Sequence, residues 1–200
     1  MIQFRYAIPK RPFRHTLLAL LTAVTVSGCG IVVATTAVVI AVDVARDRRG
    51  ARVYWDDNKI EFDIRGSISD QKEIQNENVS VTVFNGIVLL TGEVPDQRDI
   101  DKILDLAKAN KGSQQVINRL ELAGKSSHTS RANDGWITTQ VKTAMATSGA
   151  LDPTRVKVVT ERANVYLMGL VTRAEAEAAV KVTRSLRIGV IRVIKVFEYI

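Results

Sequence analysis

Hydrophobic and polar positions follow two different periods between residue 57 and the C-terminus, and the order of these periods occurs twice. A spacing of two residues predicts strands, whereas a spacing of three to four residues predicts helices with one apolar face. The predicted helices cover residues 57–69, 96–110, 134–148 and 173–186, and the predicted strands cover residues 79–84, 87–94, 115–122, 156–161, 165–171 and 190–199. Each copy therefore has the order helix, strand, strand, helix, strand.

The two copies align at a constant offset of 77 residues without a gap, so that Val79 falls on Val156 and Gly112 on Gly189. A repeat of this length indicates a duplicated small domain. Two helices and three strands pack best as a two-layer sandwich with both helices on one face of the sheet. The predicted fold class is therefore α+β, with a first domain at 57–122, a polar linker at 123–133 and a second domain at 134–200.

The hairpin turns of the two copies differ in sequence. Asn85-Gly86 joins the first pair of strands, and this dipeptide is typical of a two-residue type I′ turn. Arg162-Ala163 takes its place in the second copy, and neither residue favours positive φ. The sequence therefore predicts a turn of another type, or a longer one, in the second copy.

The N-terminal segment has the organisation of a bacterial lipoprotein signal peptide. Four basic residues and no acidic one occur in residues 1–28, and the apolar run Thr16–Val26 follows the basic part. The tetrapeptide Val-Ser-Gly-Cys at 26–29 resembles a lipobox. This resemblance implies cleavage before Cys29, acylation of that cysteine with palmitate-type chains, and a tether over residues 29–56. Gly30 implies sorting to the periplasmic face of the outer membrane.

A second interpretation of the same segment stays open. Residues 16–42 contain no charged side chain, and this length is sufficient to span a bilayer as a retained signal anchor. The two interpretations differ in what remains of the chain. Lipidation of Cys29 leaves a short apolar tract near the membrane, whereas an anchor keeps the whole span.

The composition excludes several classes of chemistry. The chain has one cysteine and two histidines, and His15 and His128 both lie outside the predicted domains. Cys/His zinc sites, Ser-His-Asp triads and Cys-His dyads therefore have no ligands or base available. We expect no enzyme, no cofactor and no metal. The net charge of +7 falls to +3 without residues 1–28, so it does not predict nucleic-acid binding.

Trp136 occupies an unusual position on the helix predicted at 134–148. At 100° per residue, Ile137, Val141 and Met145 contribute to one apolar stripe, and Trp136 lies well off it. The residues around it are polar: Thr139, Gln140, Thr143 and Thr147. Two interpretations stay open. Trp136 is an exposed anchor for a membrane interface, or it packs sideways against the linker or the first copy and closes the contact between the domains.

The charge of the two copies is opposite. Residues 57–122 contain 8 basic and 12 acidic residues, net −4, and residues 134–200 contain 10 basic and 6 acidic residues, net +4. Lys142 lies on the same predicted helix as Trp136. A basic domain with an exposed aromatic residue suits an anionic membrane. The same charges also favour attraction between the two copies, and both effects can hold together.

The chain resembles BON domains, in particular those of dual-BON outer-membrane lipoproteins. The resemblance rests on the tandem order of elements, the Gly-x-Val that closes each second strand, and the segments WITTQVKTAMATS, VKVVTE and VYLMGLVTRAEAEAA. It implies that the first helix of the second domain binds anionic phospholipid, phosphatidylglycerol in particular, and that the protein supports envelope integrity at the division site. The implied site is Trp136 with its neighbours, and we include Thr139, Gln140, Lys142, Thr143 and Thr147.

A second class of function is a protein-interaction module. In this interpretation the Trp136 face or the acidic first copy docks a protein partner of the cell envelope, in barrel assembly or in cell-wall remodelling. The sequence does not separate the two classes.

Overall fold

The computed structural model describes residues 48–74 and 78–200, and all of them belong to one compact unit. The signal peptide, the lipobox with Cys29, the alternative membrane span and most of the tether fall on residues 1–47, outside the described residues. Within the described ranges, none of the helices has the length and apolarity that crossing a bilayer requires.

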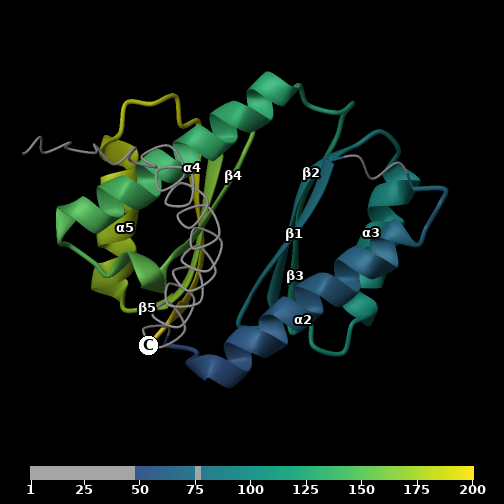
Figure 1. Ribbon diagram of the computed structural model, residues 1–200, viewed down its shortest axis with the longest axis horizontal. Helices are drawn as coiled ribbons and strands as arrows, with labels where there is room; N and C mark the ends of the chain where they lie inside the picture. Colours follow the sequence, from purple (N-terminus) through teal and green to yellow (C-terminus); the bar gives the residue numbers. More distant parts are fainter. Residues whose placement is uncertain (1–47, 75–77) are drawn as a thin grey trace, which may run out of the picture. The chain divides into compact units, whose positions relative to one another are not determined.

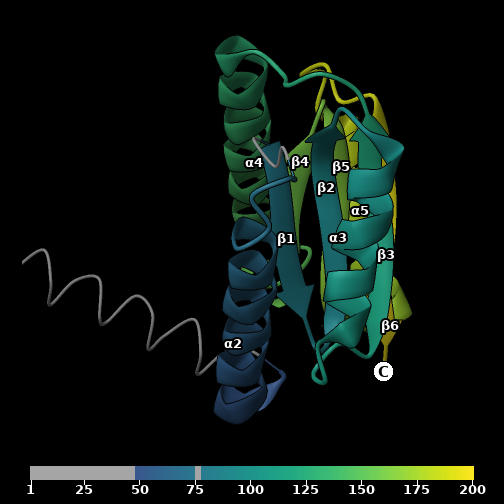
Figure 2. The same ribbon diagram turned by 90° about the vertical axis from the view of Figure 1, so that its right-hand side faces the viewer.

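The first copy folds into a three-stranded sheet with two helices on one face (Figure 1). Its elements are α2 (Gly50–Ser69), β1 (Asn78–Phe84), β2 (Ile87–Val94), α3 (Gln97–Ala109) and β3 (Gln115–Leu122). The central strand β2 is antiparallel to β1 and parallel to β3, because α3 carries the chain back between them. Figure 2 shows α2 along β1 and α3 beside β3.

The second copy repeats this topology. Its elements are α4 (His128–Ser148), the 3-10 turn η1 (Pro153–Arg155), β4 (Lys157–Glu161), β5 (Asn164–Val171), α5 (Arg173–Ser185) and β6 (Arg192–Tyr199). The central strand β5 pairs antiparallel with β4 and parallel with β6. The predicted fold class, two tandem α+β units, is confirmed.

Both first helices begin earlier than the sequence predicts. α2 starts at Gly50 and α4 at His128, 7 and 6 residues before the predicted starts. Ser127 caps α4, because its hydroxyl accepts a hydrogen bond from the backbone N–H of Ser130. Half of the predicted linker is therefore helical, and so is Trp55, which the prediction left in the tether.

A buried aspartate near the start of α2 holds the hairpin turn of the first copy. The carboxylate of Asp57 accepts hydrogen bonds from the backbone N–H groups of Asn85 (2.6 Å) and Gly86 (2.8 Å). The guanidinium of Arg49 forms an ion pair with the same carboxylate at 2.5 Å and lies 3.8 Å above the Phe84 ring. The charge of Asp57 is therefore compensated although its side chain is almost fully buried.

Asp134 makes the same contact in the second copy. Its carboxylate accepts the backbone N–H groups of Arg162 (2.9 Å) and Ala163 (2.8 Å). The prediction of a different or longer turn is wrong, because Arg162 and Ala163 have φ of 47° and 57°, close to the 50° and 73° of Asn85 and Gly86. Both turns thus have two residues with positive φ. The two hydrogen bonds to Asp134 offset the strain of this conformation in side chains other than glycine.

Each copy has its own core between its helices and its sheet. Isoleucines of α2 fill the first core: Ile60, Ile64 and Ile68. The residues that fill the second core from α4 are those of the predicted apolar stripe: Ile137, Val141 and Met145. In both copies the buried aspartate continues this stripe toward the helix N-terminus. The carboxylate and the apolar residues therefore fix the same rotation of each helix about its axis.

A third buried cluster joins the two copies through the sheet faces that the helices leave uncovered. Its members are Phe84, Ile87, Leu89, Tyr166, Met168 and Val196. Ion pairs surround it, between Lys157 and Glu61 at 3.4 Å and between Arg162 and Glu121 at 2.9 Å. In both pairs the acid comes from the negative first copy and the base from the positive second copy. Part of the opposite charge is therefore used for attraction between the domains.

Removing the aspartate and relaxing the turn should have opposite effects on stability. Asp134→Ala leaves two turn N–H groups without an acceptor, so we expect the free energy of unfolding to fall by about 2–4 kcal/mol. Ala163→Gly relieves the positive φ and should raise it by roughly 0.5–1 kcal/mol. The control is Ala146→Gly on the exposed side of α4, which should lower it by up to about 1 kcal/mol. Urea unfolding measures all three, and a loss of stability in Ala163→Gly would contradict the turn strain.

Glu161 lies among other carboxylates where the two copies meet. Burial is the largest cause that raises the pKa of Glu161, and together with the nearby charges of Glu93, Asp134 and Glu121 it brings this pKa to about 7, against the opposite effect of Arg162. A carboxyl group whose pKa is raised on folding binds a proton more tightly in the folded chain. Its contribution to stability is therefore present at low pH and is lost as the pH rises from 4.5 to about 7.

Glu161→Gln should remove this dependence on pH. The variant is expected to melt at a higher temperature than the wild type at pH 8, where the native Glu161 is ionised, and to lose that advantage at pH 5. Calorimetry at both pH values measures the difference. The same advantage at both pH values would show that ionisation of Glu161 has no part in it.

Candidate functional site

Trp136 points away from the core of its own domain. The buried residues of α4 are Asp134, Ile137, Val141 and Met145, and the centre of this stripe lies about 145° from Trp136 at 100° per residue. The indole is 49 % exposed and belongs to none of the three buried clusters of the described residues. The buried cluster that joins the two copies therefore comes from the sheet faces and does not include Trp136.

The structure gathers some of the predicted site residues around Trp136 and separates others. Three exposed threonines share its side of α4: Thr139, Thr143 and Thr147. Gln140 is half-buried at the margin of this side. Lys142 is exposed but lies about 120° from Trp136 around the helix, on its flank. We call Trp136 with the three threonines the α4 face.

The hydroxyl groups of the α4 face are largely satisfied within the helix. Thr139 donates to the carbonyl oxygen of Gly135 at 2.9 Å, and Thr147 donates to that of Thr143 at 2.9 Å. A threonine whose hydroxyl already donates to a helix carbonyl exposes its methyl group and needs no hydrogen bond to water for that donor. The α4 face therefore costs less to remove from water than its sequence suggests.

The sequence analysis missed two exposed aromatic residues of the first copy. Trp55 and Phe62 on α2 are 61 % and 77 % exposed. They lie seven positions apart and thus on one side of the helix, opposite its buried residues. Lys59, which aligns with Trp136, lies between them and forms an ion pair with Asp63 at 2.7 Å. A helical wheel over the full length of α2 would have found both aromatic residues.

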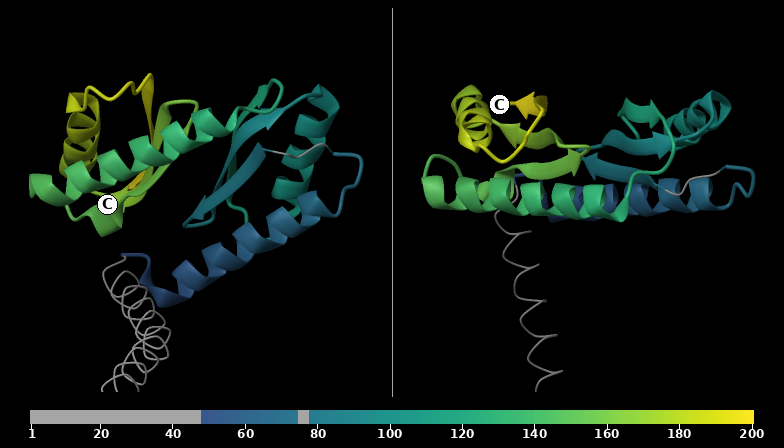
Figure 3. Two further views of the ribbon diagram at one scale, coloured as in Figure 1. Left: turned by 45° about the horizontal axis from the view of Figure 1, so that its top comes forward. Right: turned by 90° about the horizontal axis from the view of Figure 1, so that it is seen from above.

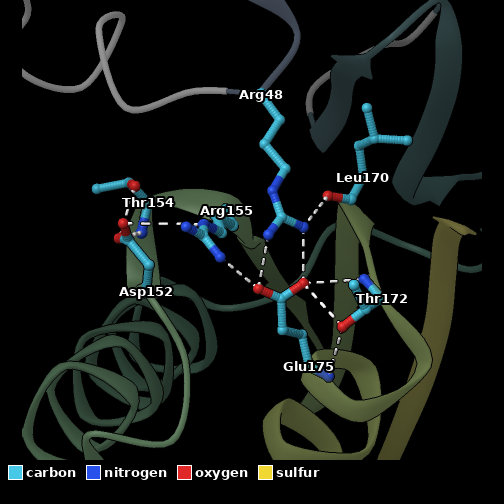
Figure 4. A network of polar contacts seen from close by, with 7 residues as sticks. All are labelled: Arg48, Asp152, Thr154, Arg155, Leu170, Thr172 and Glu175. Carbon is cyan, nitrogen blue, oxygen red and sulfur yellow. Dashed lines mark hydrogen bonds and ion pairs between the residues drawn. The ribbon is translucent and has the colours of Figure 1, made fainter. Parts of the chain in front are cut away.

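Glu175 of α5 ties the chain just before α2 to the second copy (Figure 4). The guanidinium of Arg48 donates two hydrogen bonds to its carboxylate, at 2.7 and 2.9 Å. Burial acts to raise the pKa of Glu175, but the hydrogen bonds from Arg48, Thr172 and Arg155 hold it at about 2. Arg155 is therefore engaged with Glu175 and is no part of the α4 face.

The α4 face offers contact surface to a partner or a lipid. In the ranges 48–74 and 78–200, no group of three or more histidine, cysteine, aspartate or glutamate side chains could hold a metal ion. The α4 face itself has no ionisable group. What it can do chemically is transfer an indole and several methyl groups from water to an apolar or interfacial phase.

Comparison with known proteins agrees with the repeat. The sequence pattern of the BON domain matches residues 56–124 and 133–200. The outer membrane lipoprotein DolP of Haemophilus influenzae is 37% identical over 162 residues, which is 80% of this chain and 83% of that protein. The 21 kDa hemolysin of Actinobacillus pleuropneumoniae is 32% identical over 77% of this chain and 79% of its own length.

A third relative is more distant. The osmotically-inducible protein Y of Escherichia coli is 24% identical over 66% of this chain and 67% of its own length. The two matches to the BON pattern cover the two repeated units seen in the structure. The chain therefore belongs to the BON-domain family, as a dual-BON protein similar to DolP.

Proposed function

We propose that this protein is a non-catalytic lipoprotein of the outer membrane, facing the periplasm, whose second BON domain binds anionic phospholipid through the α4 face. The observation that carries the proposal is the half-exposed Trp136, which the core of its domain does not need. A relative with 37% identity is named as an outer membrane lipoprotein, which supports the location. Its role is the maintenance of envelope integrity, at the division site.

Insertion of the indole gives the contact its energy. Tryptophan combines a large apolar ring system with one N–H donor, which suits the boundary between headgroups and acyl chains. Burying the exposed half of the side chain contributes on the order of 1–2 kcal/mol. The methyl groups of the threonines add apolar area around it, since their hydroxyl groups are bonded within the helix.

Charge selects the lipid. The second copy carries a net charge of +4, and Lys142 lies on the flank of the α4 face where it reaches headgroups beside the inserted ring. Each basic residue near an anionic surface contributes about 1 kcal/mol. The ligand is therefore phosphatidylglycerol or a lipid of the same charge.

The acyl group on Cys29 is the second attachment point. From Cys29 to Arg48 there are 19 residues, which span at most about 65 Å when extended. Because Arg48 forms an ion pair with Glu175 of α5, the tether contacts the second copy immediately before α2 begins. Two attachments bind a membrane far more stably than one. Mass spectrometry of the mature N-terminus tests this, since a retained residue 28 would exclude the anchor.

A second candidate function is docking of an envelope protein. The exposed Trp55 and Phe62 favour it, because they lie on the acidic first copy, which an anionic membrane repels. This surface differs from the α4 face in charge and in sequence. The two functions are compatible in one molecule.

Liposome binding by residues 48–200 tests the lipid site. We expect binding to vesicles that contain phosphatidylglycerol and not to vesicles of phosphatidylcholine alone. Trp136→Ala should weaken it about tenfold, from the lost burial of the indole. The matched control is Trp55→Ala, which removes the other exposed tryptophan and should leave binding intact. Equal binding by the wild type and Trp136→Ala would reject the α4 face as the lipid site. Docking of an envelope protein would then be the remaining candidate function of the protein.

A further inference from the structure

A groove of about 600 Å³ runs between α5 and β6 on the second copy. Figure 3 shows the two elements side by side at the C-terminal end of the chain. We call it the basic groove, after its lining residues Arg173, Ala176, Glu177, Val180, Lys181, Arg184, Ser185, Lys195 and Tyr199. Its volume lies within the range of sites that bind small molecules. It shares no residue with the α4 face.

The basic groove concentrates positive charge that the protein does not neutralise. Four of its residues are cationic and only Glu177 is acidic. Within the described part of the chain, Lys181, Arg184 and Lys195 have no acidic side chain within 4.0 Å. Lys181 follows Glu177 by one helical turn, a spacing that allows an ion pair, yet none forms between them. These cations are therefore available to an external anion.

The other acidic residue of α5, Glu175, does not face the basic groove. Glu175 accepts hydrogen bonds from Arg48 and Arg155 and closes the capping box with Thr172 (Figure 4). Arg48 and Arg155 thus compensate its charge on the side of the helix away from the groove. As a result α5 has its neutralised acid on one side and unpaired bases on the other.

Apolar side chains line the same groove. Ala176 is buried and Val180 is half-buried at its floor. Tyr199 contributes an exposed ring, and the guanidinium of Arg173 lies 4.9 Å from the centre of that ring. A ligand that has both an anionic group and an apolar part would therefore find partners for both.

Protection of an exposed sheet edge does not account for this arrangement. A lysine on an edge strand discourages pairing with other chains, and this role suits Lys195 on β6. Protection of the edge strand gives no reason for Lys181 and Arg184, which lie on α5 and also line the basic groove. Convergence of lysine and arginine from two elements is typical of phosphate recognition, because together they supply charge and several N–H donors.

We propose that the basic groove binds a phosphate-bearing ligand with a short apolar part, through Lys181, Arg184 and Lys195 on the phosphate and Val180 and Tyr199 on the apolar part. The headgroup of a membrane lipid and a soluble organic phosphate share this chemistry. The site is independent of the α4 face, so either one can fail without the other.

Isothermal titration calorimetry on the full chain in dodecyl maltoside, which contains no phosphate, tests the site. The probes are hexyl phosphate, inorganic phosphate and hexanol. Hexyl phosphate should bind at least about tenfold more tightly than either of the others, because only it uses both parts of the groove. Its affinity should fall at least about tenfold in Arg184→Gln/Lys195→Gln, which removes two charged donors.

The matched control is Lys72→Gln/Arg187→Gln, which removes the same charge from exposed positions outside the groove. It should bind hexyl phosphate as the wild type does. Equal weakening in both double variants would reduce the site to general charge attraction and overturn the proposal. Binding of hexaglutamate without binding of hexyl phosphate would also overturn it, in favour of an acidic peptide.

A final arm separates the two sources of ligand. Phosphatidylglycerol is added to the micelles, and the hexyl phosphate titration is repeated. Competition supports the proposal with a lipid headgroup as the natural ligand, and unchanged affinity supports it with a soluble organic phosphate.

Discussion

The hydrogen bonds that each buried aspartate accepts from a hairpin turn set the geometry on which the rest of the structure depends. Asp57 and Asp134 each accept two backbone N–H groups of the turn, so each first helix is fixed to its hairpin at one point. The apolar stripe that follows the aspartate packs on the same sheet. A rotation of the helix would break both contacts at once, and the helix therefore has one stable orientation.

This fixed orientation determines what each domain presents to its surroundings. A residue two positions after the aspartate lies about 200° further around the helix and must face outward. The first copy has Lys59 there and the second has Trp136. The duplicated fold thus provides the same exposed position twice. The two domains use this position differently: Lys59 of the acidic copy forms an ion pair, whereas Trp136 of the basic copy presents an exposed indole.

The repeat, the fold and the orientation of Trp136 were predictable because they follow from local periodicity. The turn at Arg162-Ala163 was not, since the stabilising carboxylate of Asp134 lies 28 residues away in the sequence. Trp55 was missed because no capping side chain marks the start of α2. The basic groove could not be predicted from the sequence for the same reason as the turn. Its bases come from α5 and β6, and only the packed domain brings them together.

Fluorescence of Trp136 in a chain with Trp55→Phe tests the central claim most directly, because the chain has only two tryptophans. The orientation fixed by Asp134 predicts an emission maximum typical of a partly exposed indole in solution. Vesicles with phosphatidylglycerol should shift this maximum to shorter wavelength, and brominated acyl chains should quench it. Emission of a buried indole before lipid is added, or emission that anionic vesicles leave unchanged, would contradict the account.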